Sequence, residues 1–273
     1  MRRGWWLAAC LFALLTLTLL LPMTIAFLWS LVDPRTGWFA PDLLPRRTSL
    51  HHWQTAFADR ELLASVATSL LISSLVTALS AVLALPTAWA LAKLPFRMKR
   101  AVELFVLAPL IVPGLVVGVG VGVLFFRLGL TYSIAGVVLV QLIGTLPLMI
   151  RILSAALEQI PSDLVNAARS LGATPLRAAR HVVVPLARPG FLAGGMLSFI
   201  ASFEEFEKTF IVGSPVIQTL TIKLWSSLGG QVIIFPNAAV VTFILLTPLL
   251  IIFALSVWAS RGTGVLAAGM GKL

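Results

Sequence analysis

Six long apolar stretches limit what this chain can fold into more than any other feature. A membrane-spanning helix needs about 20 mostly apolar residues, and six segments of the 273-residue chain satisfy that requirement. They are residues 5–32, 62–91, 101–126, 133–157, 189–213 and 237–260. The chain is 59% hydrophobic and only 11% charged, which is too apolar for a single soluble core. We therefore expect an all-α, polytopic membrane protein with six transmembrane helices.

The basic residues indicate which way the helices cross the membrane. If the N-terminus is cytoplasmic, the cytoplasmic side carries thirteen of the twenty lysines and arginines, and the outer side carries six. The remaining one, Lys208, falls inside a span. Cytoplasmic loops are enriched in lysine and arginine, so we expect both termini in the cytoplasm. Three regions follow: 1–61, the first transmembrane helix and a periplasmic loop; 62–260, the membrane core; and 261–273, a cytoplasmic tail.

The third span contains a row of small residues. Gly114, Gly118 and Gly122 are spaced by four, so they share one helix face and allow a second helix to approach closely. Pro109 and Pro113 interrupt the same span. The row predicts a helix-packing face, and the prolines leave open whether the span also bends as a gate.

The cytoplasmic segment 158–188 predicts two short helices. Pro161 begins the first, Gly172 ends it, and Pro175 begins the second. Leu164 and Leu171 lie on an apolar face that they share with two alanines. An exposed apolar face on a cytoplasmic hairpin indicates either a groove on a partner protein or a helix lying on the bilayer surface.

This segment resembles the EAA loop of the permease subunits of bacterial ATP-binding-cassette (ABC) importers. The resemblance rests on the run 166–168 (Asn-Ala-Ala), on Gly172, and on the run 183–185 (Val-Val-Pro). Asn166 stands where the family usually has glutamate. The resemblance implies a type I ABC importer permease fold, in which this loop is the coupling helix that binds a separate ATPase. The residues that it assigns to this role are Asn166, Ala167, Ala168, Gly172 and Pro185. Arg169 and Arg177 are candidates for contacts at the rim of the interface.

The same resemblance implies the partners and the location of the chain. It implies a second permease subunit of different sequence, a dimeric cytoplasmic ATP-binding subunit and a periplasmic solute-binding protein. The location that it implies is the bacterial inner membrane, in several passes. The net charge of +10 is explained by basic residues in cytoplasmic loops, so no nucleic-acid partner is expected. No cofactor is expected in this chain, since ATP and magnesium would bind the partner ATPase.

An acidic cluster in the fifth span predicts the translocation path. Its members are Ser202, Glu204, Glu205, Glu207 and Lys208. In a continuous helix, Glu204 and Lys208 could pair at i,i+4, which leaves a net charge of −2. Charged residues inside spans are costly and mark pathways or partners. The cluster therefore indicates either a path for a cationic solute or ion pairs to the sister permease.

The run 202–206 (Ser-Phe-Glu-Glu-Phe) resembles the Ser-x-Asp-Asp-Phe pattern of spermidine and putrescine permeases. That resemblance implies a small cationic solute such as a polyamine. The alternatives within the same importer class are 2-aminoethylphosphonate, ferric iron or an amino-acid-like solute.

Two other classes of function compete with an importer subunit. An intramembrane enzyme would need a nucleophile or a metal site, but the chain has one cysteine and three histidines, with no HExxH or GxSxG motif. We therefore expect a non-catalytic subunit without a metal. A secondary transporter, driven by ion gradients through the acidic cluster, would leave the 158–188 segment without a role.

Overall fold

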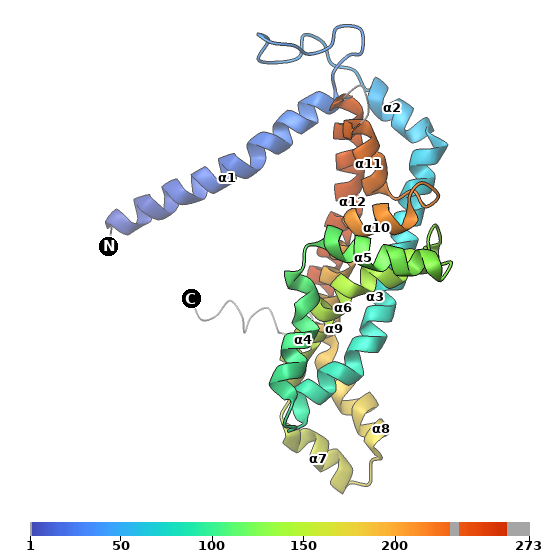
Figure 1. Ribbon diagram of the computed structural model, residues 1–273. Helices are drawn as coiled ribbons and strands as arrows, with labels where there is room; N and C mark the ends of the chain where they lie inside the picture. Colours follow the sequence, from blue (N-terminus) through green and yellow to red (C-terminus); the bar gives the residue numbers. More distant parts are fainter. Residues whose placement is uncertain (1, 230–234, 261–273) are drawn as a thin grey trace. The chain divides into compact units, whose positions relative to one another are not determined.

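The computed structural model describes residues 2–229 and 235–260, and the side chains of residues 9–228 and 235–259 (Figure 1). Helices form the regular structure of these residues, apart from one isolated bridge between Val32 and Thr48. The helices are α1 (Arg2–Ser30), α2 (His51–Ala58), α3 (Arg60–Lys93), α4 (Lys99–Ile111), α5 (Gly114–Arg127), α6 (Ile134–Glu158), α7 (Ser162–Ser170), α8 (Pro175–Ala178), the π-helix η1 (Ala179–Val183), α9 (Val184–Phe203), α10 (Glu207–Gly213), α11 (Leu220–Gly229) and α12 (Phe235–Ser260). The predicted all-α class is confirmed.

Among the residues that the structure describes, five helical stretches are long and apolar enough to cross a membrane. They are Ala9–Ser30, Arg60–Lys93, Ile134–Glu158, Pro175–Phe203 and Phe235–Ala259. Each overlaps a span predicted from the sequence. A sixth span exists if α4 and α5 are counted together, since the pair passes the same test. The predicted tail 261–273 lies outside the described residues.

The third predicted span is not one straight helix. α4 and α5 meet at an angle of 97°. Val112 between them is extended, with φ −79° and ψ 130°, and Pro113 follows as the N-cap of α5. A residue before proline is forced out of the helical region, and proline has no N–H to continue the ladder. The sequence signalled the break, and the structure shows that it turns the chain sharply.

Among the described residues, one compact unit comprises 66–221 and 248–260. Within it, α6 and α9 pack closely, because Gly190 and Gly194 of α9 leave room for Ala156 and Met149 of α6. A buried cluster on α6 and its neighbours forms the core; it includes Ala84, Ala88, Met149, Leu153, Leu157 and Ala187. This packing holds α9, whose end carries the acidic cluster.

The other compact unit comprises the described residues 2–65, 222–229 and 235–247. Aromatic contacts hold it together. The ring centroids of Phe27 and Phe243 lie 5.8 Å apart, edge to face, and those of Trp29 and Trp38 lie 4.9 Å apart. The apolar side chains along α1, from Leu11 to Leu21, are exposed. Such a surface suits lipid or another membrane subunit and would be an aggregation hazard in water.

Candidate functional site

The helix break between α9 and α10 contains the acidic cluster. α9 ends at Phe203 and α10 begins at Glu207, so the prediction of one continuous helix across residues 189–213 is wrong. The Glu205 carboxylate accepts hydrogen bonds from the backbone N–H groups of Lys208 and Thr209, both at 2.9 Å. These donors belong to the first turn of α10, where the helix itself offers no acceptors. Glu205 thus caps α10 and stabilises the break.

The break also changes which charges pair. Lys208 lies 2.8 Å from Glu205, and their side chains are only 14% and 10% exposed. The predicted i,i+4 pair between Glu204 and Lys208 is wrong, because that spacing holds only in a continuous helix. Glu205 therefore neutralises Lys208 and stabilises the start of α10, in addition to being a member of the acidic cluster.

A chain of buried hydrogen bonds extends from Glu205 to two other helices. The Thr209 hydroxyl donates to Glu205 at 2.7 Å, and the Gln141 side-chain amide donates to Thr209 at 2.7 Å. The Ser202 hydroxyl donates to the side-chain oxygen Oε1 of Gln141 at 2.5 Å. Because Ser202 is buried and committed to this network, it fixes α9 against α6. Sequence reasoning missed Gln141, although a lone amide in an apolar span was a signal.

The glycine row on α5 packs against α10. A Cβ atom at either Gly118 or Gly122 would come within 2.9 Å of the Ile211 side chain. At Gly114 a Cβ atom would collide with the Glu207 carboxylate. Gly114 is the first residue of α5, and the N-terminal end of a helix carries partial positive charge. The α4–α5 break therefore meets the α9–α10 break, with Glu207 between them.

Two carboxylates of the cluster remain exposed at this meeting point. Glu204 and Glu207 are exposed, whereas Glu205 is largely buried. Three glutamates against one lysine leave a formal charge of −2, which the exposed pair carries. Broken helices that meet inside a membrane protein are the usual setting of a solute site in transporters.

The segment 158–188 forms the predicted helical hairpin, α7 followed by α8. Gly172 ends α7 with φ +88°, a backbone conformation that favours glycine. In α8, Thr174 caps the helix by accepting from the Arg177 N–H at 3.3 Å. The π-helix η1, which sequence reasoning missed, then joins α8 to α9.

The residues assigned to the coupling role lie mainly on the surface of this hairpin. Asn166, Ala167, Arg169, Gly172 and Arg177 are exposed. Ala168 and Pro185 are half-buried. The most exposed apolar side chains are Leu171, at 89%, and Leu176, at 79%. The hairpin thus presents leucines flanked by arginines, as a docking surface would.

The base of the hairpin is held to the membrane core. The Lys93 ammonium donates to the backbone carbonyl of Ile160, just before α7. A largely apolar cavity of about 590 Å³ lies behind the hairpin, lined by residues of α3, α7 and α9 that include Trp89, Val165 and Arg169. The hairpin thus has an apolar cavity behind it and a hydrogen-bonded tether at its base.

The described residues contain no group of three histidine, cysteine or acidic side chains placed to hold a metal ion. The three histidines of the chain are accounted for in other contacts. His52 bonds to Asn237 and lies beside His51, whereas His181 bonds to the Arg177 carbonyl.

Residues 80–270 match the family model described as "Binding-protein-dependent transport system inner membrane component". The molybdenum transport system permease protein ModB of Azotobacter vinelandii is 33% identical over 167 residues, covering 56% of this chain and 74% of that protein. The sulfoquinovosyl glycerol transport system permease protein SmoH of Agrobacterium fabrum is 30% identical over 224 residues, covering 81% and 76%. The sulfate transport system permease protein CysT of Salmonella typhimurium is 27% identical over 224 residues, covering 77% and 80%.

Solved structures share the fold. A bacterial ABC transporter involved in the import of the acidic polysaccharide alginate superposes with a TM-score of 0.74 at 18% identity, covering 93% of this chain and 95% of that chain. The MetNI methionine ABC transporter superposes with a TM-score of 0.62 at 20% identity, covering 74% and 95%. The match over 80–270 spans most of the membrane core, including the broken helices and the hairpin. The chain belongs to the family of binding-protein-dependent transport system inner membrane components, the non-catalytic permease subunits of ABC importers, in which a separate ATPase hydrolyses ATP.

Proposed function

We propose that this permease subunit imports a small solute carrying an ammonium group, and that Glu204 and Glu207 line its path. The main support is that these two carboxylates are exposed where two broken helices meet, while Glu205 already neutralises Lys208. An ammonium group would replace its lost hydration with carboxylate contacts, which are strong because both partners are charged.

The charge of the site narrows the class of solute. ModB, SmoH and CysT are named for molybdenum, sulfoquinovosyl glycerol and sulfate, and these names point to anionic cargo and give no support to a polyamine. A dianion, however, would be repelled by Glu204 and Glu207, with Lys208 already engaged. A solute that carries both an ammonium and an acidic group, such as 2-aminoethylphosphonate, suits the relatives and the site together. We therefore favour such a zwitterion over the polyamine suggested by the sequence.

The test is ATP hydrolysis by the complete transporter in lipid, assembled with its sister permease, ATPase and binding protein. Solutes to compare are 2-aminoethylphosphonate, spermidine, putrescine, 4-aminobutyrate, ferric iron and sulfate. We expect stimulation by 2-aminoethylphosphonate and a large loss of its uptake in Glu204→Gln and Glu207→Gln. The control variant is Asp42→Asn, which alters a carboxylate in the loop between α1 and α2. Stimulation by sulfate or ferric iron alone would overturn the ammonium assignment.

We further propose that the hairpin 158–188 is the coupling element and docks on the cytoplasmic ATPase. Its support is the pair of exposed leucines, Leu171 and Leu176, flanked by Arg169 and Arg177. This assignment requires the hairpin and both termini to be cytoplasmic. It keeps the three regions expected from the sequence, 1–61, 62–260 and 261–273. Reporter fusions at the C-terminus and in the 33–50 loop test that orientation.

A gradient-driven secondary transporter is the competing function. It predicts uptake that persists in ATP-depleted vesicles and stops when the proton and sodium gradients are dissipated. The importer predicts uptake that stops when ATP is depleted and persists when the gradients are dissipated. Uptake measured in the presence of ATP and an ionophore therefore distinguishes an importer from a secondary transporter.

A further inference from the structure

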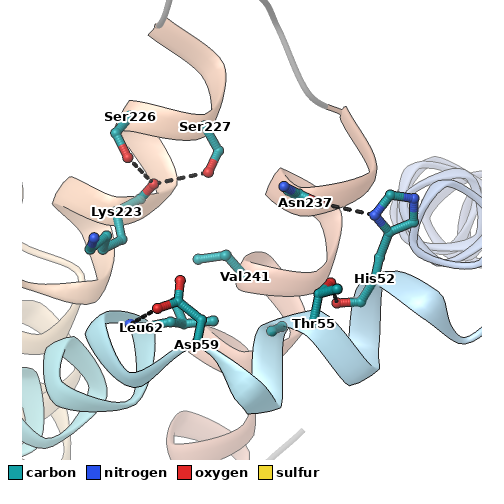
Figure 2. Close-up of a pocket in the computed structure, with 10 residues that line it drawn as sticks. His52, Thr55, Asp59, Leu62, Lys223, Ser226, Ser227, Asn237 and Val241 are labelled. Carbon is teal, nitrogen blue, oxygen red and sulfur yellow. Dashed lines mark hydrogen bonds between the residues drawn. The ribbon is translucent and has the colours of Figure 1, made fainter. Parts of the chain in front are cut away.

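A polar pocket lies on the predicted outer side of the protein, among α2, the start of α3, α11 and α12 (Figure 2). Its volume is about 220 Å³, below the roughly 300–1,000 Å³ of pockets for drug-sized ligands, so it suits a small solute. The side chains that give it chemical character are His52, Asp59, Lys223 and Asn237. None of them belongs to the acidic helix break or to the hairpin.

Asp59 supplies a negative charge at a fixed position. It lies at the elbow between α2 and α3, where its Oδ1 atom accepts from the backbone N–H groups of Glu61 at 2.8 Å and Leu62 at 3.3 Å. The second carboxylate oxygen points into the pocket (Figure 2). In the part of the chain that the structure describes, Asp59 forms no ion pair.

The nearby lysine is already paired. The Lys223 ammonium lies 2.6 Å from the Glu61 carboxylate at the edge of the pocket. With histidine counted as neutral, Asp59 and Lys223 are the charged residues of the lining, and Glu61 pairs with that lysine. Arg60 is exposed and does not line the pocket. Since the Glu61–Lys223 pair cancels, the uncompensated charge belongs to Asp59, and a single cationic group would balance it.

Asn237 supplies a hydrogen-bond donor across the pocket from Asp59. The side-chain oxygen of Asn237 lies 2.9 Å from Nδ1 of His52. The amide nitrogen is directed toward the interior of the pocket (Figure 2). An oxygen acceptor on a ligand can therefore meet Asn237 while a cationic group meets Asp59.

The wall that carries His52 and Asp59 is held in place before any ligand arrives. On α2, the Trp53 indole donates to the Ser30 hydroxyl at 3.2 Å and its ring packs against Phe57. A site that is already ordered loses less conformational entropy on binding.

We infer that this pocket binds a small primary amine that also carries an oxygen acceptor. The ammonium pairs with Asp59, and the acceptor takes a hydrogen bond from Asn237. This class of ligand is the same as that of the solute proposed for the helix break, so the choice of an amine rests in part on the proposed function. The geometry of the pocket itself does not depend on it.

Direct binding tests the inference. The transporter of this chain, its sister permease and its ATPase would be studied in lipid nanodiscs without the binding protein, which would bind the probe itself. The background is Glu204→Gln with Glu207→Gln, which removes the proposed inner site. Equilibrium dialysis then measures labelled 2-aminoethylphosphonate, with ethylphosphonate as the probe that lacks the amine.

We expect saturable binding of 2-aminoethylphosphonate and none of ethylphosphonate. Asp59→Asn keeps an oxygen to cap α3 but removes the charge, and should weaken binding at least tenfold. Asp42→Asn, which removes a carboxylate paired with Arg46 outside the pocket, should bind like the background.

Absent binding in the background, or equal affinity with and without the Asp59 charge, would overturn the outer site. Neither result touches the helix break. Conversely, Asp59-dependent binding in a transporter whose ATPase responds to none of the amines would keep the pocket and overturn the proposed function.

Discussion

Individual residues of the acidic cluster have different parts despite their similar chemistry. Glu205 accepts two backbone N–H groups, the Thr209 hydroxyl and the Lys208 ammonium. Glu204, its neighbour, is exposed. The difference comes from the end of α9, which turns one carboxylate into the protein and leaves the other outside.

Glu205→Ala should therefore destabilise the fold. It leaves Lys208 unpaired and removes the cap of α10. Removing one partner of a buried ion pair costs about 3–5 kcal/mol. We expect a clear fall in the thermal midpoint of the detergent-solubilised complex. Glu204→Ala is the matched control and should unfold at the parent temperature; similar midpoints for the two variants would contradict the structural part assigned to Glu205.

Gly172 permits a second test at a single residue. Its φ is +88°, and open space surrounds the position where a Cβ atom would stand. A substitution there is limited by backbone strain alone, at about 1–2 kcal/mol for an L-residue. Gly172→Val should alter the α7–α8 turn and lower solute-stimulated ATP hydrolysis, whereas Gly172→Asn, which tolerates this conformation better, should retain more. Equal stimulation in both variants and the parent would show that the turn has no part in coupling.

Between elements, the contact of α5 with α10 positions the helix break. The glycines of α5 bring its backbone next to Lys208 and Ile211. Any side chain on this face would push α10 away and disturb the Glu207 contact at Gly114. The small-residue row predicted from the sequence thus packs against α10, which begins with Glu207 and Lys208 of the acidic cluster.

Gly118→Leu tests this packing against a control in the same helix. A Cβ atom at Gly118 meets Ile211 at 2.9 Å, whereas Gly120 has nothing within 4 Å. Forcing extra volume into a packed interface typically costs about 1–3 kcal/mol. We expect Gly118→Leu to lower both thermal stability and uptake, and Gly120→Leu to leave both near the parent values. Loss in both variants alike would point to a general effect on α5.

For the whole molecule, the proposed docking of the hairpin predicts that assembly with the ATPase depends on its exposed leucines. Leu171→Asp places a charge on the proposed docking face without touching the membrane core. Substituting a hot-spot residue at an interface costs about 2 kcal/mol or more of binding free energy. Copurification of the ATPase should therefore fall more than tenfold. Leu43→Asp is the control, because Leu43 is 91% exposed in the loop between α1 and α2.

Copurification is measured from membranes with equal amounts of each permease variant. Undiminished recovery of the ATPase with Leu171→Asp would contradict the docking assignment. Equal loss with Leu43→Asp would instead indicate a general defect in membrane insertion.

The sequence by itself determined the class of fold and the local signals within it. The length of each apolar run requires membrane helices, since in lipid the backbone must satisfy its own hydrogen bonds. Gly172 and Pro175 fixed the ends of the short helices, because their backbone preferences act within one or two residues. The glycine spacing on α5 likewise follows from helix geometry alone.

Only the tertiary structure decided which acidic residues pair and which stay exposed. Helix periodicity paired Glu204 with Lys208, but the break at Glu204–Phe206 depends on contacts with Thr209, and through it with Gln141 on α6. The outer pocket likewise joins Asp59 to Asn237, which lie far apart in the sequence. Local patterns carry no information about such contacts, because these form only when distant helices pack together.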